Sequence, residues 1–357
     1  MADAWDGPIS RALRESPHLS RHWDWKAPAL VARAPGRLDV MGGIADYSGS
    51  LVLQLPIREA TFVAVAPDDK PQLTLLSSRE DRGVLILSLE DLIPGGEPVG
   101  YEEARAYFRR DPLRSWAAYV AGAVLVLMRE KATRFSHGAR LFIDSSVPEG
   151  KGVASSAALE VAAMMALDGL YQVGLSPLEV ALLCQKVENL VVGAPCGVMD
   201  KMTSVVGEEN RLLALLCQPA EIQGLLAIPE ELAFWGIDSG IAHAVSGEDY
   251  RSVRTGAFMG YRILQDLSGT DWGGYLANLT PSELEKCLAR LPETMSGADF
   301  IERYQRTRDE VTTVGPPSRI ESDNRPPIQC ESISESRPLL ACCGRGTRPK
   351  KHPFSES

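Results

Sequence analysis

A glycine- and serine-rich segment, PEGKGVASSAA at residues 148–158, lies between an expected strand at 140–145 and a helix-period segment that begins near Ala157. Gly150 and Gly152 have no Cβ, so the chain there can bend sharply and approach a ligand closely. The helix that follows adds its free N–H groups and the positive end of its dipole. The segment therefore predicts an anion site, most simply for phosphate. For the Gly-x-Gly spacing alone, a plain strand-to-helix turn is the alternative.

Size and composition narrow the class of protein. A chain of 357 residues with 45% hydrophobic and 24% charged residues is typical of a globular protein with room for two medium domains. The net charge of −10 argues against a general nucleic-acid binder. Seven cysteines without paired spacing and five scattered histidines indicate neither a disulfide framework nor a zinc site. We find no secretory start or membrane-length apolar run, and expect a cytoplasmic protein without a membrane partner.

The apolar patterning predicts alternating strands and helices. Strands are expected at 30–34, 51–55, 61–66, 83–89, 140–145, 211–216, 224–228 and 233–238, with a loop at 35–50 and a hairpin within 68–82. Helices are expected at 115–128, from about 157 to 171, from the Ser176 cap to about 192, and at 247–267 and 282–291. Residues 315–357 are rich in Pro, Ser and Arg without an apolar period, which predicts disorder.

One carboxylate interrupts an apolar helical stripe. Glu188 follows Ala181 and Cys184 at helical spacing, so it must be exposed, paired or bound to a cation. A glutamate at the edge of the stripe that reaches water is the alternative. Asp200 follows twelve residues later. Phosphoryl transfer to a hydroxyl needs Mg²⁺ and a carboxylate for the hydroxyl proton, and Mg²⁺ favours few protein ligands. Ser156 and Glu188 are the candidate Mg²⁺ ligands, which leaves Asp200 for the proton.

The glycine segment lacks the Gly-Lys-[Ser/Thr] ending of a Walker loop and the third glycine of a dinucleotide fingerprint. It resembles the nucleotide motif of the galactokinase, homoserine kinase, mevalonate kinase and phosphomevalonate kinase (GHMP) superfamily. Residues 34–49, APGRLDVMGGIADYSG, resemble the galactokinase signature. The resemblance implies ATP as a substrate, held by the loop residues Pro148, Gly150, Lys151, Gly152, Val153, Ala154, Ser155, Ser156 and Ala157.

The resemblance also implies a two-domain α+β fold. Its parts would be a lead segment at 1–29, an N-terminal mixed α/β domain with the nucleotide loop at 30–222, an incomplete ferredoxin-like α+β domain at 223–314, and a disordered or frame-shifted tail at 315–357. The family's third glycine-rich motif is not found, and residues 341–347 resemble it only faintly.

By the same resemblance, Arg37 lies beside Asp200 and stabilises the transferring phosphoryl group, while Asp46 accepts hydrogen bonds from sugar hydroxyls. Without the other motifs, Arg37 could belong to an ordinary loop ion pair. Galactokinases carry Glu-His-Thr where this chain has Gly43, Ile44 and Ala45. Losing two polar groups should select a sugar that lacks the hydroxyl they bind, such as the pentose L-arabinose.

Several segments are similar to the L-arabinokinase branch of this superfamily, among them GGIADYSG, VPEGKGV, CQKVEN, GAPCGVMD and WGIDSGI. Plant members continue Met-Asp-Gln where this chain has Lys201, which we interpret as a surface-type change. The resemblance places Tyr250 and Asp238 near the sugar. For Tyr250, an amphipathic helix position with a packed ring and a hydrated hydroxyl is the alternative.

The expected activity is an ATP-dependent sugar 1-kinase that phosphorylates the anomeric hydroxyl of L-arabinose. Galactose or another monosaccharide is the alternative substrate. A non-catalytic sugar and ATP sensor, or a non-functional fragment, are alternatives of another kind, and the sequence leaves the oligomeric state open.

Overall fold

The computed structural model describes residues 8–79, 81–240 and 248–315. The chain divides into two compact units, one of Met1–Asp46 with Leu51–Glu248 and one of Tyr47–Ser50 with Asp249–Ser357. The first unit thus runs past residue 222, where the sequence suggests a domain boundary. Residues 316–357, with the tail and the candidate third motif, lie outside the described residues.

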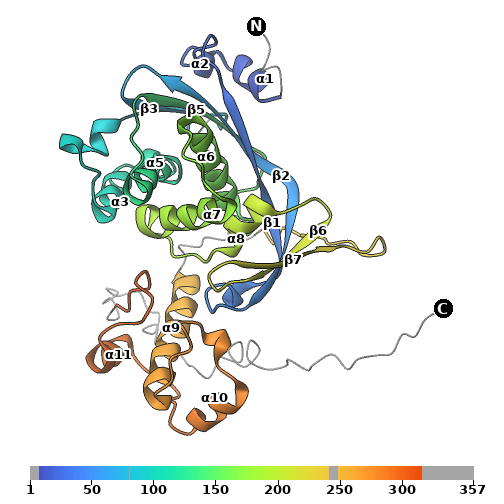
Figure 1. Ribbon diagram of the computed structural model, residues 1–357, viewed down its shortest axis with the longest axis vertical. Helices are drawn as coiled ribbons and strands as arrows, with labels where there is room; N and C mark the ends of the chain where they lie inside the picture. Colours follow the sequence, from blue (N-terminus) through green and yellow to red (C-terminus); the bar gives the residue numbers. More distant parts are fainter. Residues whose placement is uncertain (1–7, 80, 241–247, 316–357) are drawn as a thin grey trace. The chain divides into compact units, whose positions relative to one another are not determined.

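The first unit is built on one mixed sheet (Figure 1). Its strands are β1 (Leu30–Met41), β2 (Leu51–Asp68), β3 (Gln72–Ser77), β4 (Val84–Ser88), β5 (Gly138–Ser145), β6 (Arg211–Leu216) and β7 (Glu221–Ala227). They are ordered β4-β3-β5-β2-β6-β7, and β1 also pairs with β2. Only the β3–β5 pair is parallel among the described strand pairs. The start of β2 pairs with β6 and its end pairs with β5.

The first two strands are longer than the sequence predicts. The expected strands at 51–55 and 61–66 are one strand, and β1 continues through the expected start of a loop at Pro35. The pairing of β1 with β2 shifts register between Pro35 and Arg37 and again between Asp39 and Met41. A proline cannot donate a ladder hydrogen bond, and a bulge accommodates it without ending the strand. Arg37 therefore lies on a strand and not on a loop.

Side chains of the sheet alternate between two cores, as a strand's period of two requires. Val63 and Val65 of β2 face the larger core, while Ala64 and Ala66 face a smaller one. The smaller core is covered by α1 (Pro8–Arg14) and α2 (Pro17–Ser20), which the sequence reading missed.

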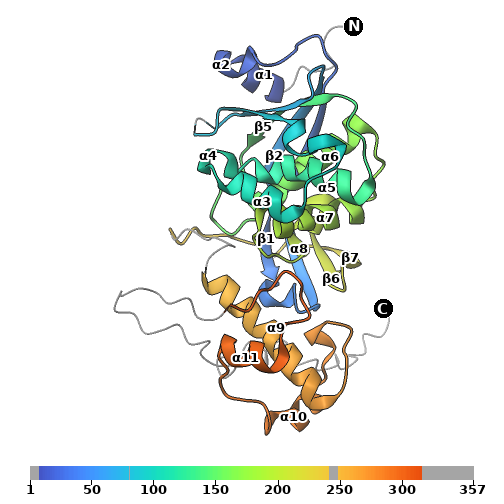
Figure 2. The same cartoon turned by 90° about the vertical axis from the view of Figure 1, so that its left-hand side faces the viewer.

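Helices cover the other face of the sheet (Figures 1 and 2). They are α3 (Tyr101–Arg109), α4 (Pro112–Ser115), α5 (Ala118–Lys131), α6 (Ser155–Tyr171), α7 (Pro177–Lys186) and α8 (Met199–Val206). The predicted helices at 115–128, 157–171 and from the Ser176 cap are confirmed within a few residues at their ends. Helices α3, α4 and α8 were not predicted. Both α5 and α6 are buried on almost every side, which explains their largely apolar composition.

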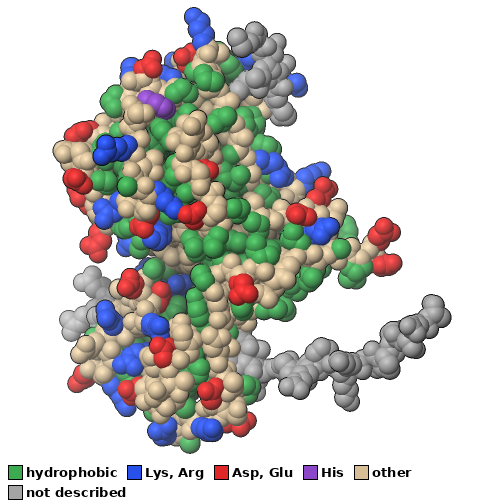
Figure 3. Space-filling view, viewed as in Figure 1, with side chains coloured by type: hydrophobic (Ala, Val, Ile, Leu, Met, Phe, Trp, Pro, Cys, Tyr) green, Lys and Arg blue, Asp and Glu red, His purple; other side chains and the backbone are tan. Residues whose placement is uncertain are grey.

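The end of the first unit departs from the prediction. β7 begins three residues before the expected strand at 224–228, and the expected strand at 233–238 does not form. Trp235 and Ile237 in that segment are 86% and 93% exposed, and Ile222 and Leu226 of β7 are half-exposed. Figure 3 shows apolar side chains gathered on the surface near β1 and β7. Among the described residues, β7 pairs only with β6, and 233–238 adds no strand to the free edge of β7.

The second unit is helical where it is described. It contains α9 (Glu248–Ser268), a 3-10 turn η5 (Leu276–Asn278), α10 (Pro281–Leu288) and α11 (Gly297–Tyr304). The guanidinium of Arg254 lies 5.0 Å from the ring of Tyr47 and 5.1 Å from that of Phe258, and donates to Asp309 at 2.9 Å. Within residues 249–315, the structure assigns no strand of the expected ferredoxin-like domain. No helix in the described part of the chain is long and apolar enough to cross a membrane.

Candidate active site

The glycine loop between β5 and α6 adopts the conformation that its composition permits. Gly150 and Gly152 have φ values of 68° and 69°, in the left-handed region that glycine adopts without strain. Ala154 is also left-handed, with φ of 60°, and α6 begins at the next residue, Ser155. The amino end of α6 therefore opens on the loop, as the sequence predicts for an anion site.

Strand β1 contacts this loop and fixes its position. The amide of Arg37 donates to the carbonyl of Val153 at 3.0 Å. A Cβ on Gly36 would lie 2.7 Å from the same carbonyl oxygen, so the backbones approach too closely for any side chain there. The guanidinium of Arg37 adds a third link, from Nη1 to the carbonyl of Gly152 at 2.7 Å. The loop is thereby fixed to the sheet.

The same guanidinium is paired with Asp200, which lies in the first turn of α8. Arg37 Nε and Nη2 donate to Asp200 Oδ1 at 3.0 and 2.7 Å. Arg37 is 7% exposed. A pair shielded from water in this way is stronger than the surface ion pair that was the alternative for Arg37. The structure thus joins two sequence-predicted residues, 163 positions apart, beside the glycine loop.

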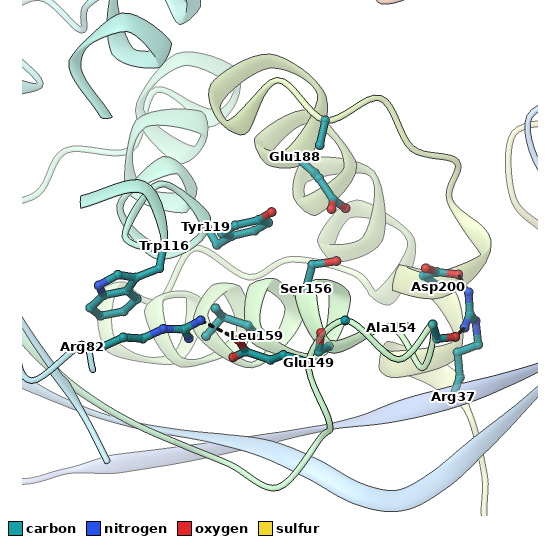
Figure 4. A pocket seen from close by; sticks show the side chains of 14 residues that line it. Arg37, Arg82, Trp116, Tyr119, Glu149, Ala154, Ser156, Leu159, Glu188 and Asp200 are labelled. Atoms are coloured by element: carbon teal, nitrogen blue, oxygen red, sulfur yellow. Dashed lines mark hydrogen bonds and ion pairs between the residues drawn. The ribbon is translucent and has the colours of Figure 1, made fainter. Parts of the chain in front are cut away.

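A cavity of about 290 Å³ lies against the loop, within the first unit. In Figure 4, Trp116 and Arg82 lie at one end, Arg37 and Asp200 at the other, and Ser156 and Glu188 point into the space between. Its lining comprises Arg37, Arg82, Trp116, Tyr119, Glu149, Gly150, Gly152, Ala154, Ser155, Ser156, Leu159, Glu188, Ala194 and Asp200. Four of the expected nucleotide contacts, Pro148, Lys151, Val153 and Ala157, are not among these lining residues.

The aromatic end of the cavity escaped the sequence reading. The ring of Trp116 is covered by the guanidinium of Arg82 at 5.4 Å, and Arg82 also donates to Glu149 at 2.8 Å. The indole Nε1 of Trp116 is buried and has no hydrogen-bond partner in residues 8–79, 81–240 and 248–315. The available signal was an aromatic pair, Trp116 and Tyr119, at the start of an otherwise small and aliphatic helix.

Glu188 is held by a distorted helix end. Helix α7 starts with a capping box between Ser176 and Glu179, and continues into a π-helical segment, η4 (Val187–Val192). π-Helical turns often occur at functional sites. Glu188 is 2% exposed, so it is not a glutamate at the edge of the stripe that reaches water.

The partner of Glu188 is Lys201, so our interpretation of Lys201 as a surface-type change is wrong. Lys201 is 1% exposed, and its Nζ forms an ion pair with Glu188 Oε2. The same Nζ lies 3.1 Å from Cys196 Sγ and 3.8 Å from an oxygen of Glu160. Glu160, fully buried in the middle of α6, was not identified from the sequence. The sequence feature that could have identified Glu160 is its position as the single carboxylate within the apolar run from Ala157 to Leu167.

The charges of this cluster follow from burial and proximity. Burial, and then the charge of Glu188, raise the pKa of Glu160 well above its usual range. Burial disfavours the ammonium of Lys201, but the surrounding negative groups, Glu188 among them, outweigh it and raise the Lys201 pKa. The closest ion pair of the cluster is Lys201 with Glu188, and Glu160 lies farther from Nζ, at 3.8 Å.

Asp46, which directly follows residue 45, is buried against the amino end of α8. Its carboxylate accepts from the amides of Val198 at 3.0 Å and Met199 at 3.3 Å. Burial, and then the charge of Asp200, raise the pKa of Asp46 to about 6. Gly43 lies in a 3-10 turn, η1 (Gly43–Ala45), with φ of 63°. Asp46 therefore lies within electrostatic reach of Asp200, and its oxygens already have backbone partners.

Comparisons with known proteins decide the family. Residues 118–208 match the GHMP kinases N terminal domain, and residues 22–67 match the galactokinase galactose-binding signature. The chain is 34% identical over 317 residues to a galactokinase of Chloroflexus aggregans, covering 80% of this chain and 75% of that protein. The chain belongs to the galactokinase family of the GHMP kinases.

Within this family, the chain is 44% identical over 358 residues to an L-arabinokinase of Arabidopsis thaliana, covering 85% of this chain. It spans only 34% of the length of that protein. A galactokinase of Lactococcus lactis, solved in complex with galactose, has the same fold with a TM-score of 0.61 and 20% identity. That match covers 78% of this chain and 66% of the galactokinase. The GHMP-kinase-like mixed α/β fold expected from the sequence is confirmed.

GHMP kinases use ATP, and the residues present fit an accompanying Mg²⁺. Ser156 and Glu188 supply oxygen atoms to one cavity beside the phosphate loop, and Mg²⁺ takes its other ligands from phosphates and water. The described residues contain no group of three or more His, Cys, Asp and Glu that could hold a metal alone. Any Mg²⁺ here therefore depends on nucleotide phosphates. One oxygen of Glu188 is already occupied by Lys201.

The remaining expected sugar contacts are less clearly placed. Asp238 is about half-exposed and pairs with Lys151 of the glycine loop at 2.8 Å. The hydrogen bond from Lys151 lowers the pKa of Asp238. Tyr250 lies in the first turn of α9 in the second unit. Asp238 is not among the residues that line the cavity described above.

Proposed function

We propose that this GHMP kinase is an ATP-dependent sugar 1-kinase, with L-arabinose as its substrate. One observation carries the proposal. Arg37 binds both the carboxylate of Asp200 and the carbonyl of Gly152, so a proton acceptor and a phosphate loop border the same cavity. The 44% identity to an L-arabinokinase and 34% identity to a galactokinase support a sugar as the acceptor.

The residues divide the reaction between them. The anomeric hydroxyl oxygen of the sugar attacks the γ-phosphorus, the new O–P bond forms, and the bond to the bridging oxygen of ADP breaks. Asp200 accepts the hydroxyl proton, and Arg37 stabilises negative charge on the phosphoryl oxygens. The amino end of α6 and the Gly150–Gly152 amides bind the remaining phosphates. Bound Mg²⁺, held by Ser156 and Glu188, would neutralise phosphate charge.

The choice of sugar rests on the turn before Asp46. Gly43 has open space around its Cβ position, and Ala45 carries only a methyl group. We infer that these positions leave no hydrogen-bond partner for the hydroxyl on a sixth sugar carbon, which favours a pentose. Asp46, Tyr250 and Asp238 remain the proposed sugar contacts. A ferredoxin-like second domain and a cytoplasmic location, which suits the free thiols of the described cysteines, also remain proposals.

ADP release measured with L-arabinose, D-galactose and D-glucuronic acid tests this function. We expect turnover with L-arabinose and weaker turnover with galactose. Asp200→Asn should lower kcat at least about 100-fold while the protein still binds nucleotide. Absence of sugar-dependent ADP release from a folded, nucleotide-binding protein would overturn the assignment.

A second function has one observation in its favour. Glu188, a proposed metal ligand, already forms an ion pair with Lys201. A protein that binds sugar and ATP without transferring phosphate could have its metal ligand paired in this way. Such a sensor would show sugar- and ATP-dependent changes in melting temperature but no ADP release. The intact Arg37–Asp200 pair favours the kinase.

A further inference from the structure

The wall of the cavity contains a buried cation. Glu188 lines the cavity, and the Nζ atom of Lys201 contacts its Oε2. Lys201 itself is not among the residues that line the cavity. Its Nζ lies 3.8 Å from Glu160 and 3.1 Å from Cys196, and the exposed fractions of the Lys201, Glu188 and Glu160 side chains are 1%, 2% and 0%.

An ammonium group in this position cannot easily leave. Transferring an unpaired charge into a protein interior is very unfavourable, so a buried lysine remains bound to its counter-ion. The side chain of Lys201 comes from α8, directly after Asp200, and α8 is fixed through the bonds from Val198 and Met199 to Asp46. The negative charge of Glu188 is therefore neutralised by the protein itself.

This pairing opposes a divalent cation. A metal ion bound to Glu188 would lie within a few ångströms of the Lys201 ammonium, and at that distance two positive charges repel strongly even at the effective dielectric of a protein. The metal must displace or tolerate a positive charge that is already present. The carboxylate therefore attracts Mg²⁺ less than a free glutamate in the same place.

We propose that Lys201 is a resident counter-ion for Glu188 that weakens divalent-cation binding in the nucleotide cavity, and so sets the metal requirement of this protein. The inference rests on the proposed function only in taking Glu188 as a metal ligand. Lys201 does not line the cavity and acts through Glu188, so it is a positioning residue. A resident cation predicts that the protein needs a higher metal concentration than its Lys201→Gln variant.

Mn²⁺ binding to the full chain with ADP present tests this without turnover. Free Mn²⁺ is measured by electron paramagnetic resonance for the native protein, Lys201→Gln, Glu188→Gln and the double variant, each checked for folding by circular dichroism. We expect Lys201→Gln to tighten Mn²⁺ binding at least about tenfold. Glu188→Gln should weaken binding at least about tenfold in the Lys201→Gln background, where it removes a free carboxylate, and also in the native background, where it leaves the Lys201 ammonium without its counter-ion.

Two further variants separate charge from packing. Lys201→Arg keeps the positive charge and should keep the weak Mn²⁺ binding. Glu160→Gln removes the neighbouring carboxyl but leaves the Lys201–Glu188 pair, so it should leave Mn²⁺ affinity unchanged. If Lys201→Gln does not fold because two carboxyl groups then face each other, the Lys201→Gln, Glu160→Gln double variant replaces it.

The outcomes distinguish this inference from the proposed function. Unchanged or weaker Mn²⁺ binding by folded Lys201→Gln, with a large loss in Glu188→Gln, would show Glu188 to be a ligand and overturn the counter-ion. No effect of Glu188→Gln in either background would remove Glu188 from the metal site, and this inference with it. Both results are compatible with kinase activity, so neither would contradict the proposed function.

Discussion

Replacing Gly197 by alanine should destabilise the start of α8, which carries Asp200. A Cβ at this position would overlap the carboxylate of Asp46 far inside van der Waals contact. Asp46 cannot move away freely, because it is 6% exposed and accepts hydrogen bonds from the amides of Val198 and Met199. To make room, the carboxylate must lose these two bonds while it stays buried.

The cost can be estimated from those bonds. Each hydrogen bond to a charged group contributes about 1.5–3 kcal/mol, so losing two should lower the free energy of unfolding of Gly197→Ala by about 3–6 kcal/mol. For a unit of this size, that corresponds to a fall in melting temperature of roughly 10 °C. Urea unfolding followed by circular dichroism measures the first quantity, and calorimetry measures the second.

Two matched variants isolate the contact. Gly100 is the N-cap of α3 and has nothing within 4 Å of its Cβ position, so Gly100→Ala should cost at most about 1 kcal/mol. In an Asp46→Ala background the overlap is gone, and Gly197→Ala should then also cost less than about 1 kcal/mol. An equal, large cost of Gly197→Ala in both backgrounds would refute the reasoning, because the contact with Asp46 would not be its source.

Three further results are expected. Since the pKa of Asp46 rises from 3.8 to about 6 on folding, the folded state binds this proton more tightly than the unfolded state. The free energy of unfolding should therefore fall by about 3 kcal/mol as pH rises from about 4 to 6. Urea unfolding at a series of pH values measures this slope, which Asp46→Asn should lack. Ser176→Ala removes the capping box of α7 and should cost about 1 kcal/mol in the same assay, and a change below 0.3 kcal/mol would count against the cap. Arg37→Lys cannot bind Asp200 and Gly152 together, so ADP release should slow at least about 100-fold at saturating sugar; a rise in KM alone would place Arg37 in binding only.

The sequence predicted the parts of the site that depend on local chain geometry. Glycines at 150 and 152 indicated a sharp turn before a helix, and the structure has a turn there, with both glycines left-handed, followed by α6. Ser176 and Pro177 marked a helix start that is confirmed with its capping box. These signals act within a few residues, so a single sequence contains them in full.

The sequence did not show the parts that depend on distant partners. Lys201 looked like a surface residue because its counter-ions, Glu188 and Glu160, are 13 and 41 positions away. Pro35 appeared to end a strand, yet pairing with β2 carries β1 through a bulge there. The segment at 233–238 has the composition of a strand but forms none, although β7 has a free edge among the described strands. Tertiary contacts, which local patterns do not encode, decided each case.

The attachment of the glycine loop to β1 affects the thermodynamics of ligand binding. Through the amide of Arg37 and the close approach at Gly36, the loop loses its conformational freedom when the sheet forms and not when an anion arrives. A ligand then finds its amide donors already oriented, and little ordering entropy opposes binding. Hydrogen exchange should therefore show the Arg37 amide protected in the free protein, with little further protection when ADP is added.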